Sequence, residues 1–119
     1  MPGGRVTIHG DQAIHRRVRS DVARTEKTYR QVKADPETKR VFQIDNSVSP
    51  TKITGITIVQ MSEQSREALT ADLKALENDR ALVEFAMEDD RTPVSRAKYV
   101  EDLRRIDEKR KLLEQVLHP

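Results

Sequence analysis

Hydrophobic residues recur at alternating four- and three-residue steps through the last half of the chain, a spacing typical of helices that pack side by side. One arginine falls within each of two such runs. The first run consists of Leu69, Leu73, Leu76, Arg80, Val83 and Met87. The second run follows a break at residues 90–93 and consists of Tyr99, Leu103, Ile106, Arg110, Leu113 and Leu117. Two stripes joined by a short loop predict an antiparallel helical hairpin over residues 61–119.

Residues suited to cap helices stand at the start of both predicted helices. Ser62 can accept a hydrogen bond from the first turn of one helix, and Thr92 followed by Pro93 suits the start of the other. Arg80 and Arg110 can pack their aliphatic stems in the seam while their guanidinium groups reach water. Because each helix would bury only one thin stripe, we expect this hairpin to dock on something larger.

A third helix is predicted over residues 11–36, after a flexible N-terminus at residues 1–10. Asp11 can cap its start, and the residue before Pro36 is disfavoured in a helix, so the helix should end near Asp35. Asp35 and Pro36 could equally open a short following turn. The helix carries one thin apolar stripe, made of Ile14, Val18, Val22, Thr25, Tyr29 and Val32.

The segment between these helices, residues 37–60, follows a different pattern. VFQID and KITGITIVQ are rich in β-branched residues, with Ser-Val-Ser-Pro between them. We interpret the segment as extended chain that can form a weak hairpin. Two strands alone are marginal in water, so an ordered hairpin would need cover from elsewhere.

Composition favours an extended shape over a compact globule. Only 35% of the 119 residues are hydrophobic and 35% are charged, against typical values of about 45–50% and about 25%. The fold class we predict is mostly α: an extended, non-globular chain with a basic N-terminal helix, an irregular or extended middle and a C-terminal antiparallel helical hairpin. Such a chain would gain much of its order from a partner.

Positive charge is concentrated at the start of the chain. Residues 1–40 contain ten Lys or Arg and five Asp or Glu, although the whole chain carries only +2. The predicted first helix supplies most of these cations: Arg16, Arg17, Arg19, Arg24, Lys27, Arg30 and Lys33. Docking on an acidic protein surface is the favoured interpretation, ahead of a plain solvated face. Nucleic acid is the least favoured, because no aromatic platform accompanies the cations.

Catalytic, metal and membrane sites find little support in the sequence. There is no cysteine, and His9, His15 and His118 are scattered without metal-ligand spacing. We therefore predict a non-enzymatic protein with no metal, no cofactor and no small-molecule substrate. No apolar run is long enough to cross a membrane, and the N-terminus lacks the apolar core of a signal peptide, so we expect a soluble intracellular protein of the cytoplasm or cytoskeleton.

One stretch, ARTEKTYRQVKADP, resembles the conserved block of the cilia- and flagella-associated protein 144 family, also called family with sequence similarity 183. The resemblance covers residues 9–45, about a third of the chain. Beyond Ile44 the chain departs from that family and has no tryptophan. The features that carry the resemblance, in order, are Arg24, Thr25, Lys27, Tyr29, Gln31, Asp35 and Pro36.

The resemblance implies a microtubule inner protein of the cilium or flagellum, bound to tubulin and other axonemal proteins inside the doublet. In that role Arg24 and Lys27 would pair with acids of the partner, Tyr29 would fill a partner pocket and Pro36 would turn the chain. Tyr29 could instead pack on the chain's own hairpin. The basic residues Arg16, Arg17 and Arg30 complete the candidate partner-binding set. A coiled-coil adaptor and a small basic nucleic-acid-binding protein remain the alternatives.

Overall fold

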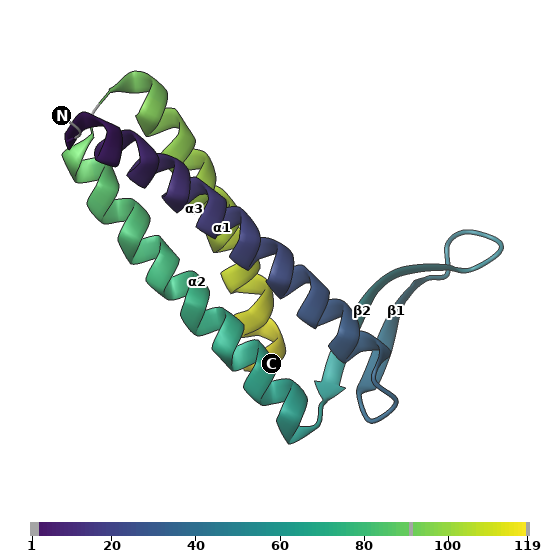
Figure 1. Ribbon diagram of the computed structural model, residues 1–119. Coiled ribbons are helices and arrows are strands. Elements are labelled where there is room, and N and C mark those ends of the chain that lie inside the picture. The colour runs from purple at the N-terminus through teal and green to yellow at the C-terminus, as the bar shows by residue number, and fades with distance from the viewer. Residues whose placement is uncertain (1–2, 91, 119) are drawn as a thin grey trace.

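Three long helices and a two-stranded sheet make up the computed structural model, which describes the backbone of residues 3–90 and 92–118 and side chains from Gln12 onward (Figure 1). The chain is mostly helical. In chain order the elements are α1 (Gly3–Ala34), β1 (Lys39–Asp45), β2 (Lys52–Gln60), α2 (Glu63–Asp89) and α3 (Pro93–Leu117).

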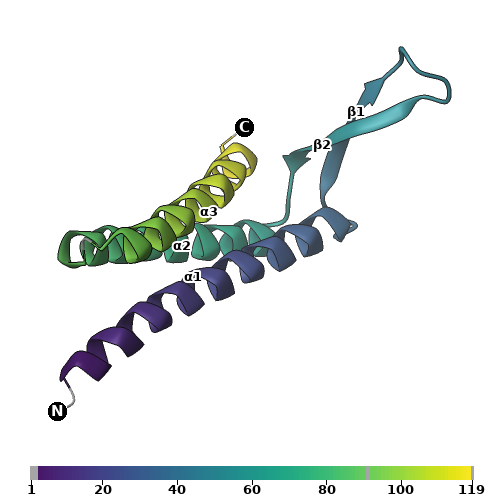
Figure 2. The ribbon, with the colours of Figure 1, turned by 90° about the horizontal axis from the view of Figure 1, so that it is seen from above.

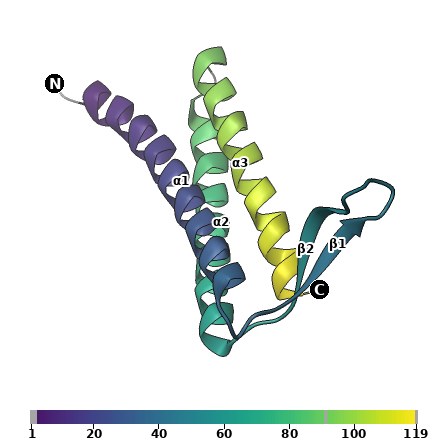
Figure 3. The same ribbon diagram turned by 90° about the vertical axis from the view of Figure 1, so that its right-hand side faces the viewer.

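The helices lie side by side, with α2 antiparallel to both α1 and α3 (Figures 1 and 3). The first turns of α1 diverge from the other two helices (Figure 2). The sheet projects from the end of this body, where α1 leads into α2. The Cα radius of gyration is 18.3 Å, against about 13–14 Å for a compact domain of this length. The extended shape expected from the composition is therefore present in part.

The core follows a seven-residue repeat on every helix. Each helix contributes three buried positions in heptad register: Val18, Thr25 and Val32; Leu69, Leu76 and Val83; Tyr99, Ile106 and Leu113. A heptad repeat keeps one face of a helix directed at its neighbours along its whole length. The stripes predicted for residues 69–87 and 99–117 thus supply core positions, and the stripe of α1 packs against them.

The start of α1 differs from the prediction. The helix begins at Gly3, so residues 3–10 are helical where we expected a flexible segment, and Asp11 is not a cap. Glycine costs only about 1 kcal/mol in a helix, so the glycines before Asp11 do not suffice to stop one. The remainder of the predicted flexible segment, residues 1–2, lies outside the described residues.

The other helix ends follow the predicted signals closely. The α1 helix ends at Ala34, and Asp35 Oδ1 then accepts the Glu37 N–H at 3.0 Å in the turn that contains Pro36. Ser62 caps α2 by accepting the Ser65 N–H at 3.2 Å. Thr92 occupies the cap position of α3 with proline next in the helix, but makes no side-chain cap bond.

The two strands form an antiparallel hairpin, as expected for residues 37–60. Phe42 pairs with Ile56, and Ile44 pairs with Ile53, with register shifts next to residue 39 and between Gln43 and Ile44. The buried exception on the hairpin is Ile58, which joins the helical core. The helices therefore cover only the base of the hairpin, and most of it stands in solvent.

Candidate partner-binding surfaces

Several cations of α1 meet acids of the same chain. Arg17 Nε donates to Asp79 Oδ1 of α2 at 3.1 Å. Arg24 donates from Nε to Asp72 Oδ1 at 3.2 Å and pairs through Nη2 with Asp21 at 2.9 Å. Asp72 and Asp79 are buried. The acidic surface that the sequence led us to expect for α1 is therefore provided, in part, by α2.

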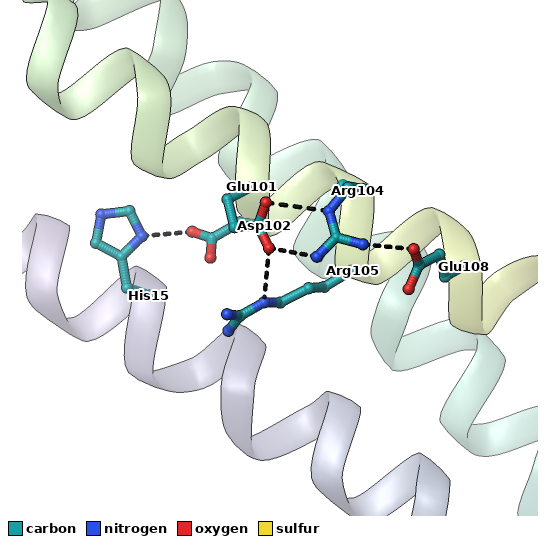
Figure 4. A network of polar contacts seen from close by, with 6 residues as sticks. All are labelled: His15, Glu101, Asp102, Arg104, Arg105 and Glu108. Atoms are coloured by element: carbon teal, nitrogen blue, oxygen red, sulfur yellow. Dashed lines mark hydrogen bonds and ion pairs between the residues drawn. The ribbon is translucent and has the colours of Figure 1, made fainter.

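A histidine makes the corresponding contact with α3. His15 Nδ1 bonds the buried Asp102 carboxylate (Figure 4). The His15 ring also lies 5.0 Å from the Tyr99 ring, centroid to centroid. Among the described residues no serine or threonine hydroxyl bonds His15, and the chain has no cysteine. The pair consequently reads as a helix-to-helix contact and lacks the nucleophile of a catalytic triad.

Two residues of the ARTEKTYRQVKADP block pack inside the protein. Thr25 is fully buried, and its hydroxyl donates to the Asp21 carbonyl oxygen at 2.9 Å. Tyr29 is half-buried against the core, with Lys33 Nζ 4.7 Å from the centre of its ring. Burial raises the pKa of the Tyr29 hydroxyl. Tyr29 thus packs within the chain's own helical body, as the alternative interpretation held.

The rest of the candidate set stays on the surface. Asp35 is half-buried and its Oδ2 accepts from Ser65 Oγ at 3.4 Å, which ties the end of α1 to α2. Among the described residues the exposed members make no side-chain hydrogen bond or ion pair: Arg16, Lys27, Arg30, Gln31 and Pro36. The structure therefore divides the set into residues that hold α1 in place and residues that remain available to a partner.

The buried acids Asp72, Asp79 and Asp102 are the residues that sequence reasoning missed. Asp72 and Asp79 lie seven residues apart and continue a second three-four stripe beside Leu69 and Leu76. Arg80 and Arg110 were expected to pack their stems in the seam with their guanidinium groups reaching water; both are part-exposed and pair with Asp107. Acids repeating at heptad spacing beside an apolar stripe, in a chain with a basic first helix, were the available signal.

The Asp79 carboxyl group lies in a buried environment that disfavours its charged form. Its side chain is 0% exposed. Burial, and next the neighbouring Asp21 carboxylate, raise the pKa of Asp79 to about 7, although Arg17 opposes the rise. The folded state therefore retains a proton that an unfolded chain would release at about pH 4.

This proton makes stability depend on pH. As the pH rises from about 4 to about 7, the free energy of unfolding should fall by roughly 2–4 kcal/mol, because the folded state must then carry a buried negative charge. Asp79→Asn should remove this fall and be as stable as the native chain, or more so, at pH 8. Urea unfolding of both proteins across this pH range measures the difference.

Asp107→Asn, at a part-exposed carboxylate, is the control and should leave the fall in the free energy of unfolding intact.

A carboxyl group whose pKa is lowered on folding has the opposite effect on the pH dependence of stability. The pKa of Glu101 is lowered to about 2, first by its hydrogen bond with Arg104, so its stabilisation is lost as the pH falls (Figure 4). An equal slope in the native chain and Asp79→Asn would contradict the assignment.

A second surface, the apolar face of the hairpin, stands apart from the helices. Directly paired residues share a face of a sheet, and this face carries Phe42, Ile44, Ile53 and Ile56. These residues are 48%, 53%, 59% and 36% exposed, respectively. The stripe continues at the base of the hairpin into the buried Ile58. Val41 and Val59 are exposed as well.

The charged residues of the strands are mainly basic. Lys39, Arg40 and Lys52 are exposed, against the single acid Asp45, whose pKa is lowered by hydrogen bonds from Ser47. Both strand edges lack a further strand in this two-stranded sheet. An apolar stripe with basic flanks and unpaired backbone edges has the features of a surface that binds another protein.

Comparisons with protein-family models, curated proteins and solved structures found no match to this chain. Within the described part of the chain, no group of three or more His, Asp or Glu side chains is placed to hold a metal ion. None of the helices there is long and apolar enough to cross a bilayer.

Proposed function

We propose that this chain is a non-enzymatic structural protein of the ciliary or flagellar axoneme. In this role it binds tubulin and neighbouring proteins inside the doublet microtubule and stabilises the lattice. The observation that carries the proposal is the apolar hairpin face of Phe42, Ile44, Ile53 and Ile56, which projects from the helical body into solvent. The axonemal setting comes from the resemblance of residues 9–45.

The physical case for a binding role begins with the cost of this exposed face. Burying apolar surface contributes about 25 cal/mol per Å², and a hairpin with one open face leaves that gain unrealised. A partner that covers the face would also order the strands, which are marginal alone. The basic flank of Lys39, Arg40 and Lys52 favours an acidic partner, and tubulin is acidic.

The helices have a supporting role in this proposal. The α2 and α3 helices act as a helical hairpin that holds the basic helix α1. The α2 helix does so through the pairs of Arg17 and Arg24 with buried acids, and α3 through the contact of Asp102 with His15. The exposed cations Arg16, Lys27 and Arg30 add contacts with partner acids. Many such modest contacts, repeated along a lattice, would resist separation of protofilaments.

The position of α1 bears on the coiled-coil adaptor, the first alternative, but not on a nucleic-acid-binding protein, the second. A coiled-coil adaptor would need the apolar stripes of α2 and α3 to receive a partner helix, but α1 already covers part of that face. A partner helix would thus have to displace α1 together with its ion pairs. Binding of nucleic acid stays open to a direct test through the cations of α1.

The test replaces the hairpin face and follows incorporation into axonemes. The variant Phe42→Thr, Ile44→Thr, Ile53→Thr keeps β-branched residues in the strands and removes most of the apolar face. The matched control is Phe85→Thr, Val94→Thr, Val100→Thr, which removes exposed apolar residues of α2 and α3 instead. Tagged proteins are expressed in flagellated cells, and the fraction retained in detergent-extracted doublets is measured.

We expect the control to be retained like the native chain and the hairpin variant to be largely lost from the doublets. Equal retention of both variants would refute a binding role for the hairpin. Absence of the native chain from doublets would refute the axonemal setting itself.

A further inference from the structure

A groove lies between α1 and α3, toward the end of the helical body that is far from the sheet. Its larger part has a volume of about 580 Å³ and lies between residues 12–19 of α1 and residues 97–105 of α3. A second part of about 340 Å³ shares Arg19 and Arg105 with it and extends to Glu26. The two parts therefore adjoin at Arg19 and Arg105.

Four cations and three acids line the groove. The three acids already have partners: Glu26 pairs with Lys109, Glu101 with Arg104 and Asp102 with His15. Arg16 and Arg19 line it from α1, and Lys98 and Arg105 from α3. Among the described residues, Arg16, Arg19 and Lys98 make no ion pair or side-chain hydrogen bond. Arg105 reaches from α3 toward α1 and holds Glu101 at 3.3 Å (Figure 4). Most of the positive charge here is thus uncompensated within the described chain.

The lining also includes small and apolar side chains and the pair of His15 with the buried Asp102. Ala97 lies on the α3 side, and Val22 and Ala23 lie on the α1 side. Because these side chains are small, they leave space between α1 and α3. Unpaired cations beside small and apolar side chains suit an acidic chain that also brings small or apolar side chains.

We propose that this groove binds an extended, carboxylate-rich peptide segment of a partner protein. The spacing agrees: Lys98 and Arg105 are seven helical residues apart, about 10 Å along α3. Alternate residues of an extended peptide are about 7 Å apart on one side. Two or three alternating acids would therefore span the cations. This inference rests on the proposed function, from which we take it that the partner is an acidic protein.

A peptide fits better than a nucleic-acid strand for two reasons. Glu101 also lines the groove, and its oxygens can accept a hydrogen bond from a peptide backbone N–H, a donor that the phosphodiester backbone of a nucleic acid does not offer. In addition, Tyr99 is fully buried, and among the described residues no Phe or Tyr ring lines the groove to stack on bases.

The test measures binding of a fluorescent synthetic peptide that alternates glutamate and alanine, by fluorescence polarisation with the full chain. The groove variant is Arg16→Glu, Arg19→Glu. The control is Lys74→Glu, Lys111→Glu, which changes net charge equally at exposed positions outside this groove. Circular dichroism confirms that each variant is folded. A single-stranded RNA oligonucleotide of equal charge is measured in parallel.

We expect the peptide to bind the native chain in a salt-sensitive manner. The groove variant should bind roughly tenfold more weakly or worse, and the control within about twofold of native. No peptide binding, or equal weakening in both variants, would overturn the proposal. Tighter groove-dependent binding of RNA would overturn the choice of a peptide.

The hairpin variant of the preceding subsection separates this inference from the proposed function. It should bind the peptide like the native chain, because Phe42, Ile44 and Ile53 lie outside the groove. Loss of the peptide site with normal incorporation into doublets would leave the proposed function standing. If the native chain binds the peptide but is absent from doublets, the peptide site stands and the proposed axonemal function is refuted.

Discussion

Replacing Leu76 by alanine will lower the free energy of unfolding by about 2–5 kcal/mol, because the substitution leaves a cavity in a fully buried position. Leu76 lies at the middle of the α2 repeat, between Leu69 and Val83, in the core shared by all three helices. Domains of this size are commonly stable by only about 5–15 kcal/mol. Urea unfolding, followed by circular dichroism at 222 nm, measures the loss.

Val94→Ala is the control for this substitution. Val94 is exposed on the first turn of α3, so its truncation should change the free energy of unfolding by no more than about 0.5 kcal/mol. A similar small effect of Leu76→Ala would mean that the helices do not share a close-packed core, contrary to the heptad arrangement.

Replacing Arg24 by glutamate is expected to weaken the attachment of α1 selectively. The substitution removes the cation between Asp21 and Asp72 and places a third carboxylate there. The loss should be about 2–4 kcal/mol, less than for a fully buried pair because the Arg24 side chain is half exposed. Hydrogen exchange followed by mass spectrometry should show loss of protection first in α1.

Two further variants define this effect. Arg30→Glu makes the same change of charge at an exposed residue whose charge acts on Glu26 across solvent, without a hydrogen bond, and should cost no more than about 0.5 kcal/mol. Arg24→Glu combined with Asp72→Lys restores opposite charges across the α1–α2 contact and should recover much of the stability. If Arg30→Glu and Arg24→Glu are equally destabilising, the effect is one of overall charge.

The sequence was most informative about individual elements. The three-four spacing located α2 and α3, Ser62 marked a helix start, and the β-branched residues of VFQID and KITGITIVQ located the strands. Each of these signals is local, because it depends on the period or on one residue at a helix end. The start of α1 escaped prediction for the same reason, since a possible cap at Asp11 does not stop a helix from beginning earlier.

The sequence was less informative about which surfaces meet. The periodicity of α1 identified Thr25 and Tyr29 as stripe residues, but it could not tell whether that stripe faces another protein or the chain's own helices. The same ambiguity applied to Arg17 and Arg24, whose acids lie about 50 to 60 residues away in sequence. Exposure of the hairpin face likewise depends on where the helices end. All three features are set by the tertiary arrangement of the elements, which local sequence patterns do not specify.

The proposed binding role requires that α1 is held by acids of its own chain, so that the hairpin and the remaining cations are left for a partner. Hydrogen exchange of the native protein alone tests this most directly. We expect amides of α1 between Val18 and Val32 to exchange about as slowly as those around Leu76, and exposed hairpin amides to exchange faster. Rapid exchange throughout α1, with α2 and α3 still protected, would contradict it.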